Sequence, residues 1–305
     1  MEEKSGLGAK WDGERSFQTL FLTELVGLSL YRKVKDAPRE KERFLEVYPQ
    51  VKQELEESIR KLHALADKID KVHRDCTITQ VVASSTSAVS GVLTILGLTL
   101  APVTAGVSLG LSATGMGLGA AAAVTSVSTT IVEKVSTASV EAEASQLLPR
   151  SNDTENDIKS NNTEKDIKEI VEKSTPRLIS VFKKSSRDLE VMKKNIDAIK
   201  ITKVSPRLAN NAKRLMTTGK VSAKSTTQVK KVFGGTALAM TKGARIMGVA
   251  TAGLSLVTDV FSLIEDSKHL HEGAKAESAA KLRQQAKDME QKLQELIRVH
   301  DILTQ

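Results

Sequence analysis

The chain has 305 residues, of which 40% are apolar, and its 45 Lys and Arg exceed its 37 Asp and Glu to give a formal net charge of +8. Aromatic residues make up only 3%, which excludes a core or a planar-ligand pocket built on large rings. A single cysteine excludes an intrachain disulfide, so the chain does not need an oxidising compartment. Few prolines and many good helix formers predict an all-α fold, with amphipathic helices around a central hydrophobic helical hairpin and a C-terminal coiled-coil-like helix.

Residues 1–75 are predicted to form N-terminal amphipathic helices. Residues 17–31 are interpreted as one such helix rather than a secretory signal, because Gln18 and Glu24 interrupt the apolar core that a signal requires. We therefore expect a cytoplasmic protein, peripherally or conditionally membrane-associated, with secretion as the less favoured alternative. A second helix is indicated by an apolar stripe with spacings of three and four, formed by Val51, Leu55, Ile59, Leu62, Ala66 and Ile69.

The segment 76–150 is predicted to be a hydrophobic hairpin, because residues 76–132 are 57 consecutive positions without Asp, Glu, Lys or Arg. Pro102 divides this run into 26 and 30 residues, and each part exceeds the ~20 needed to cross a bilayer. Abundant Ser, Thr and Gly make insertion conditional, and a hairpin buried among soluble helices is the alternative. The residues predicted to contact lipid acyl chains are Val92, Leu93, Ile95, Leu96, Leu98, Leu100, Leu109, Leu111, Met116 and Leu118.

Two glycine pairs in this hairpin have the spacing that lets helices approach closely, namely Gly106 with Gly110 and Gly115 with Gly119. The second pair also lies in a loose GxGxxG pattern, with Glu133 placed to imitate the ribose-binding acid of a dinucleotide site. That motif requires a preceding strand and a strand–helix–strand context, which the sequence lacks. Helix contact is therefore the favoured interpretation.

Two further segments follow the hairpin. Residues 151–175 carry a partly repeated polar sequence and are predicted to be a linker. Residues 176–245 contain 17 Lys or Arg against 3 Asp or Glu, a net charge of +14, and are predicted to be a basic amphipathic region that binds anionic lipid headgroups. A solvated face is the alternative, and nucleic acid is not an expected partner, because stacking aromatics are scarce. The predicted headgroup contacts are Lys183, Lys184, Lys193, Lys194, Lys213, Arg214, Lys230 and Lys231.

Residues 246–305 are predicted to hold a second apolar segment and a coiled-coil-like helix. Asp259 interrupts the apolar segment, and as a costly charge in a bilayer it is the candidate pH-sensitive membrane residue. The last 35 residues carry an apolar seam, which we expect to pair with the stripe at 55–69, the alternative partner being another protomer. The residues that would mediate such self-association are Leu282, Met289, Leu293 and Leu296.

Motifs for catalysis or metal binding are missing from the sequence. It contains no Walker loop, HExxH, GxSxG or CxxC pattern, and none of its five histidines forms a convincing ligand set. We predict that the protein is not an enzyme, has no catalytic residue, and takes no metal or other cofactor.

Four segments, at 62–70, 90–102, 205–210 and 236–242, resemble the apolipoprotein L family in their order and spacing. The resemblance implies lipid binding, association with intracellular membranes and, in some members, channel-like insertion, with links to innate immunity and cell death. We therefore predict a lipid-binding protein of the apolipoprotein L type that uses its basic region and hydrophobic hairpin on phospholipid membranes, in lipid transport or innate immune defence. The alternatives are a pore- or channel-forming protein and a helical protein-interaction or cell-death regulator.

Overall fold

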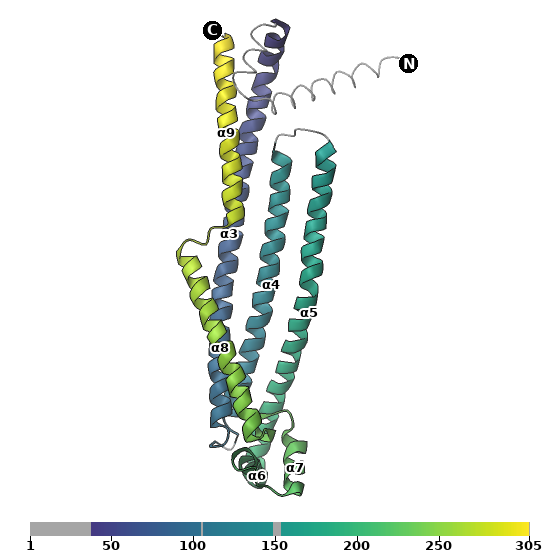
Figure 1. Cartoon of the computed structure of the whole chain (residues 1–305), viewed down its shortest axis with the longest axis vertical. Helices are drawn as coiled ribbons and strands as arrows, with labels where there is room; N and C mark the ends of the chain where they lie inside the picture. The colour runs from purple at the N-terminus through teal and green to yellow at the C-terminus, as the bar shows by residue number, and fades with distance from the viewer. Residues whose placement is uncertain (1–37, 105, 149–153, 305) are drawn as a thin grey trace, which may run out of the picture. The chain divides into compact units, whose positions relative to one another are not determined.

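The computed structural model describes residues 38–104, 106–148 and 154–304, so the helix predicted at 17–31 lies outside the described residues. Within those ranges the chain is helical and has no strand, which confirms the predicted all-α class (Figure 1). The elements are α3 (Pro38–Leu100), α4 (Leu109–Leu147), α5 (Thr154–Val204), α6 (Pro206–Thr217), α7 (Ala223–Phe233), the 3-10 helix η1 (Ala237–Ala239), α8 (Lys242–His271) and α9 (Glu277–Thr304).

Two compact units divide these helices. Unit 1 takes its described residues from Met1–His73, Lys134–Ile170 and Lys275–Gln305, and unit 2 takes its residues from Arg74–Glu133 and Val171–Ala274. The three long helices α3, α4 and α5 each contribute to both units. The five segments expected from composition therefore differ from the units into which the chain packs.

Helix boundaries differ from the sequence expectation in two places. α3 runs without a break through position 76, where the hairpin was expected to begin, and ends at Leu100, just before the helix-breaking Pro102. The segment 151–175, expected to be a linker, is helical from Thr154 onward as the first part of α5. Glu and Lys are good helix formers and no Gly or Pro occurs before Pro176, so a polar composition alone did not prevent helix formation.

The core of unit 1 is formed where the apolar stripe of α3 packs against the seam of α9. Leu62 and Ala66 are fully buried in this core, together with Val140 and Ala144 of α4. The C-terminal seam thus pairs with the stripe inside the chain. Of the residues predicted for self-association, Leu282, Met289 and Leu296 are buried in this core and Leu293 packs against it.

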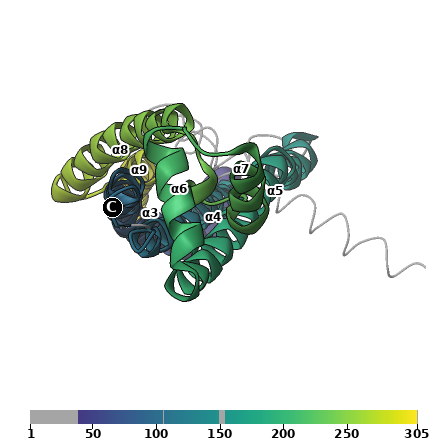
Figure 2. The ribbon, with the colours of Figure 1, turned by 90° about the horizontal axis from the view of Figure 1, so that it is seen from below.

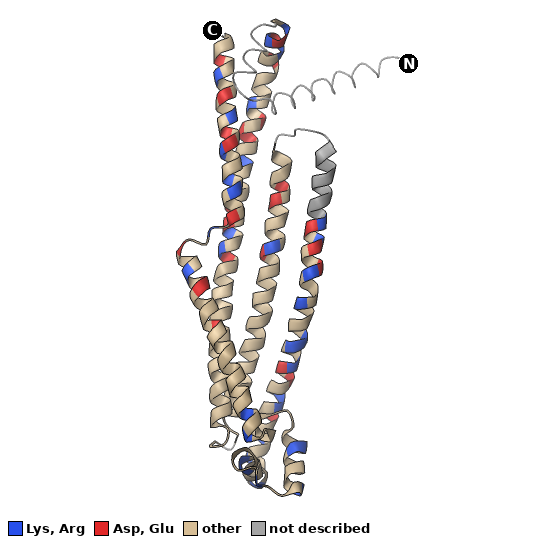
Figure 3. Cartoon of the chain, viewed as in Figure 1, with Lys and Arg blue, Asp and Glu red and all other residues tan. Residues whose placement is uncertain are grey.

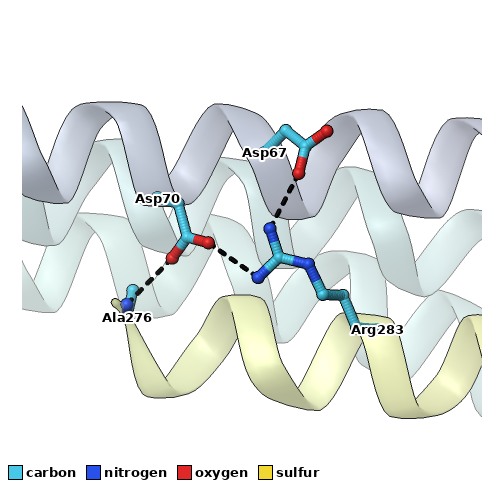
Figure 4. Close-up of polar contacts among 4 residues, drawn as sticks. All are labelled: Asp67, Asp70, Ala276 and Arg283. Atoms are coloured by element: carbon cyan, nitrogen blue, oxygen red, sulfur yellow. Dashed lines mark hydrogen bonds and ion pairs between the residues drawn. The ribbon is translucent and has the colours of Figure 1, made fainter. Parts of the chain in front are cut away.

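A group of polar contacts lies beside this core. Asp70 accepts a hydrogen bond from the backbone N–H of Ala276 at 2.9 Å, immediately before α9, and so satisfies an amide that lacks a helical partner (Figure 4). The guanidinium of Arg283 donates to Asp70 at 2.6 Å and to Asp67 at 2.7 Å. Burial raises the pKa of Asp70, but the hydrogen bonds from Ala276 and Arg283 outweigh it and hold that pKa below its ordinary value of 3.8. Charge therefore fixes the register of α9 on α3.

Unit 2 buries its large apolar side chains at one place. The loop end of the α3–α4 hairpin contributes Leu98 and Leu109, which pack with Met216, Phe233 and Leu238 from α6, α7 and η1. α6 and α7 lie side by side over this cluster (Figure 2). Outside this cluster the helices of unit 2 pack through small and polar residues, as described below.

We expect the pairing of α3 with α9 to weaken in acid. Because the pKa of Asp70 is depressed in the folded chain, its stabilising contribution is present above about pH 4 and is lost as the pH falls through the folded pKa. Thermal unfolding followed by circular dichroism should show the intact chain to be more stable than an Asp70→Asn variant at pH 6, with the difference shrinking below pH 4. Glu56→Gln, at an exposed carboxylate of the same helix, is the control and should show little difference. A constant gap between the intact chain and Asp70→Asn would contradict this account.

Candidate membrane-binding surface

The long helix α8 places its large apolar side chains at the surface of unit 2. None of its residues is buried, although it is one of three described helices, with α3 and α4, whose length and composition suit a membrane span. Leu254 is 73% exposed and Phe261 69%. A continuous apolar face of this kind is uncommon on soluble monomers and marks a surface that contacts something apolar. It consists of Ile246, Met247, Leu254, Val257, Val260, Phe261 and Ile264.

Two aspartates of α8 point in the opposite direction, toward α3. The hydroxyl of Ser87 donates to the carboxylate of Asp259 at 2.8 Å, and that of Ser84 donates to Asp266 at 3.1 Å. The two aspartates lie two helical turns apart on one side of α8, and the two serines lie one turn apart on one side of α3. These hydrogen bonds hold α8 against α3 together with the close approach of Leu256 to Gly91, where an added Cβ would lie 3.3 Å from the leucine.

Small residues allow close packing between the two arms of the hairpin. A Cβ atom on Gly115 of α4 would lie 2.7 Å from the carbonyl oxygen of Ser90 in α3, and the hydroxyl of Ser90 donates to the carbonyl of Gly115 at 2.6 Å. Gly119, one turn further on, also faces Ser90. The predicted helix contact is thus made by the second glycine pair. Gly106 lies instead before α4 with a φ of +100°, and Gly110 faces Ile199 of α5.

A polar cavity of about 600 Å³ lies inside unit 2, among α3, α4, α5 and α8. Its charged lining residues are Lys184 and Asp188 of α5 with Asp259 and Asp266 of α8. Along these helices unit 2 thus combines internal hydroxyl and carboxylate groups with exposed apolar side chains. The hydroxyl and amide side chains in the lining are Gln80, Ser84, Ser87, Ser90, Thr94, Ser126, Ser185, Ser255 and Ser262.

The residues predicted to contact acyl chains fall into three groups. Leu98 and Leu109 are buried in the core of unit 2. Leu93, Ile95, Met116 and Leu118 are partly exposed. Val92, Leu96, Leu100 and Leu111 are exposed.

Sequence reasoning missed part of the exposed apolar face on α3. Ile78, Val82 and Val89 are exposed and lie on the N-terminal side of Val92 and Leu96. Their separations of four and seven residues place them on one side of a helix, and this periodicity could have identified them. The apolar surface of α3 is therefore longer than was predicted.

The basic residues predicted to contact headgroups are all exposed in unit 2. Four of them lie on α5, two on α6 and two on α7, whereas the parts of α3 and α4 in unit 2 show long stretches without charge (Figure 3). Lys194 forms an ion pair with Glu190 at 2.7 Å, and the hydrogen bond from Lys194 lowers the pKa of that glutamate. Lys184 also lines the polar cavity.

The described residues contain no group of three or more His, Cys, Asp and Glu side chains that could hold a metal ion. Cys76 is buried in unit 2, where its thiol lies 3.9 Å from the carbonyl oxygen of Thr129. The chemistry that the described surface offers is thus apolar contact, positive charge and internal hydroxyl–carboxylate bonding.

Comparison with known proteins places these features in a family context. The sequence profile described as Apolipoprotein L matches residues 22–298. Human apolipoprotein L3 is 44% identical over 263 residues, which cover 86% of this chain and 62% of that protein. Human apolipoprotein L6 is 39% identical over 270 residues, 88% of this chain and 76% of that protein, and human apolipoprotein L1 is 36% identical over 262 residues, 85% and 64% respectively. The match thus spans less than two thirds of apolipoproteins L3 and L1, and no solved structure matches the chain.

We expect a side chain at Gly115 to disrupt the hairpin. Gly115→Ala would place a methyl group against the backbone of α3, and such overpacking typically costs about 1–3 kcal/mol. Gly253→Ala in α8 is the matched control, because a Cβ there meets nothing within 4 Å. Thermal unfolding of the full chain in detergent micelles should show a lower midpoint for Gly115→Ala alone. Equal midpoints for both variants would show that the arms do not pack as described.

Proposed function

Because the chain belongs to the apolipoprotein L family, we propose that it binds phospholipid and associates with membranes through unit 2, in lipid transport or innate immune defence. The observation that carries this proposal is the orientation of α8. Seven of its large apolar side chains are exposed, while Asp259 and Asp266 bond inward to α3. A lipid surface is the apolar environment that matches such a helix.

Burial energetics support acyl chains as the contact of the apolar face. Removing one large aliphatic or aromatic side chain from water contributes about 1.5–3 kcal/mol. Leu254 and Phe261 are both more than two-thirds exposed, and Val257 between them is 53% exposed. The free energy of transferring this face from water into the acyl region is therefore favourable.

Positive charge supports an anionic headgroup as the second contact. A Lys or Arg near an anionic membrane surface contributes about 1 kcal/mol. The exposed basic pairs of α5, α6 and α7 belong to the same unit as α8, so one unit carries both kinds of contact. In this proposal the basic pairs dock on headgroups and the apolar helices engage the acyl region.

Asp259 gives the proposal a pH dependence. A charged Asp at the centre of a bilayer costs about 2.5–3.5 kcal/mol, so protonation would ease insertion of α8. Its surroundings include Asp266 on the same helix and Lys184 and Asp188 on α5, all lining one cavity. We accordingly expect acidification to promote insertion.

Liposome flotation tests the headgroup contact. Changing four exposed basic residues of unit 2 to Glu should weaken binding to anionic vesicles, most strongly at low salt, where screening is least. The control makes the same charge change at four exposed basic residues of unit 1 and should bind nearly as well as the intact chain. If both variants bind as the intact chain does, the headgroup assignment is wrong. The test set is Lys183, Lys184, Lys230 and Lys231, and the control set is Lys68, Lys71, Lys287 and Arg298.

The acyl contact is tested by the same assay on vesicles of neutral phospholipid. Leu254→Ser with Phe261→Ser removes two outward apolar side chains and should reduce partitioning by roughly tenfold or more, given the burial energies above. Thr258→Ser, at an exposed residue of the same helix, should leave partitioning unchanged. Unreduced partitioning of the double variant would exclude this face from lipid contact.

A second candidate function, ion conduction, is favoured by the polar cavity. Its hydroxyls and carboxylates lie among helices of which three have the length and composition of membrane spans. Polar residues that face the interior of a membrane bundle mark ion pathways in many membrane proteins. Potassium release from loaded vesicles, measured at neutral and acidic pH, tests this candidate, and no release at either pH would eliminate it.

A further inference from the structure

The loop that joins α3 to α4 exposes two aliphatic side chains at one end of unit 2. In the described part of this loop Val103 is 73% exposed and Val107 is 63% exposed. The exposed apolar surface continues behind the loop on both arms of the hairpin, at Leu100 of α3 and Leu111 of α4. Loops of soluble proteins are usually polar, so an apolar loop of this kind indicates contact with an apolar partner.

Several polar groups of this loop form hydrogen bonds within the hairpin. The backbone N–H of Val107 donates to the carbonyl oxygen of Thr104 at 3.2 Å, and the N–H of Ser108 donates to the hydroxyl of Thr104 at 3.2 Å. The hydroxyl of Ser108 in turn donates to the carbonyl oxygen of Gly97 at 3.1 Å. Backbone in contact with acyl chains must satisfy its polar groups within the protein, because no water is available there. The loop therefore already has bonds of the kind that contact with lipid requires.

A basic cap, formed by α6, α7 and η1 (residues 206–239), packs directly against this loop (Figure 2). A Cβ on Gly106 of the loop would lie 3.0 Å from the side chain of Leu238 in η1. The chain contains no Asp or Glu between Asp197 and Asp259, so no acidic residue offsets the charge of the cap. The cap carries seven Lys or Arg, all of them exposed, namely Arg207, Lys213, Arg214, Lys220, Lys224, Lys230 and Lys231.

We propose that this end of unit 2 docks on an anionic phospholipid membrane, with Val103 and Val107 at the boundary of headgroups and acyl chains and the basic cap on the phosphates. Charge and side-chain type specify this partner. A membrane surface presents negative charge above a uniform apolar layer, whereas protein interfaces depend on aromatic and Arg anchors that fill pockets. This inference rests on the proposed function and adds the loop as a contact distinct from α8.

A tryptophan reporter tests whether the loop reaches the acyl region. The chain has one natural tryptophan, Trp11, so Val103→Trp is introduced into the full chain together with Trp11→Phe. On anionic vesicles whose phospholipid is brominated in its acyl chains, the emission should shift to the blue and be strongly quenched. Ile302→Trp in the same background, at an exposed residue of unit 1, is the control and should be quenched little. If the intact chain floats with these vesicles but the Val103→Trp reporter is not quenched, this inference is overturned and the proposed function stands, whereas an intact chain that does not float overturns both.

Removal of the two valines tests their contribution to binding. Val103→Ser with Val107→Ser should weaken flotation with anionic vesicles by roughly tenfold or more, because two exposed aliphatic side chains are lost from the contact. Val132→Ser with Ile302→Ser removes two other exposed aliphatic side chains and should bind as the intact chain does. Unreduced binding of the loop variant would overturn the proposal. If that variant instead loses self-association in sedimentation equilibrium, the loop is a protein contact.

Charge reversal tests the basic cap. Arg207→Glu with Lys224→Glu, added to the Val103→Trp reporter, should reduce its quenching on anionic vesicles, most clearly at low salt, and have little effect on neutral vesicles. The loop and its valines are unchanged in this variant, so a loss of quenching reports the charge alone. Equal quenching with and without these changes on anionic vesicles would remove the basic cap from the contact and overturn the proposal.

Discussion

The hydroxyl-to-carboxylate bonds between α3 and α8 determine which side of α8 is exposed on unit 2. Asp259 and Asp266 have partners only if the polar side of α8 faces Ser87 and Ser84. Once that side faces inward, the apolar face faces outward, because the two lie on opposite sides of the helix. The exposed apolar face, the polar cavity and the proposed contact with lipid all follow from this orientation.

Unit 1 is assembled by the opposite rule. Its helices bury an apolar stripe and leave their charged residues at the surface, as helices of soluble proteins do. Beside this core Arg283 is held between the carboxylates of Asp67 and Asp70. One chain thus combines a unit with a buried apolar stripe and a unit with an exposed apolar face, and α3 takes part in both.

Periodicity and charge predicted much of this architecture. The stripe near Leu62 and the seam near Leu296 were visible as spacings of three and four, and each needed a partner, so their pairing could be anticipated. The glycine spacing at Gly115 likewise indicated the close contact within the hairpin. These signals could be read from the sequence because each is a local spacing that follows from the geometry of a single helix.

What could not be predicted depends on residues far apart in the sequence. Ser87 and Asp259 are 172 positions apart, and neither shows that the other is its partner. Leu98 and Leu109 resemble their exposed neighbours in type, but they are buried because α6, α7 and η1 cover the end of the hairpin. The helical start of α5 was missed for another reason, since polar composition was given more weight than helix propensity.

The serine and glycine content of the α3–α4 hairpin has a consequence for rigidity. In water the bond from Ser90 to the carbonyl of Gly115 competes with solvent, so its net contribution is modest. In a medium of low dielectric constant the same bond has no competing solvent and becomes stronger. Transfer from water to lipid would therefore stiffen the interior of unit 2, so that this unit would be least dynamic in the lipid environment proposed for it.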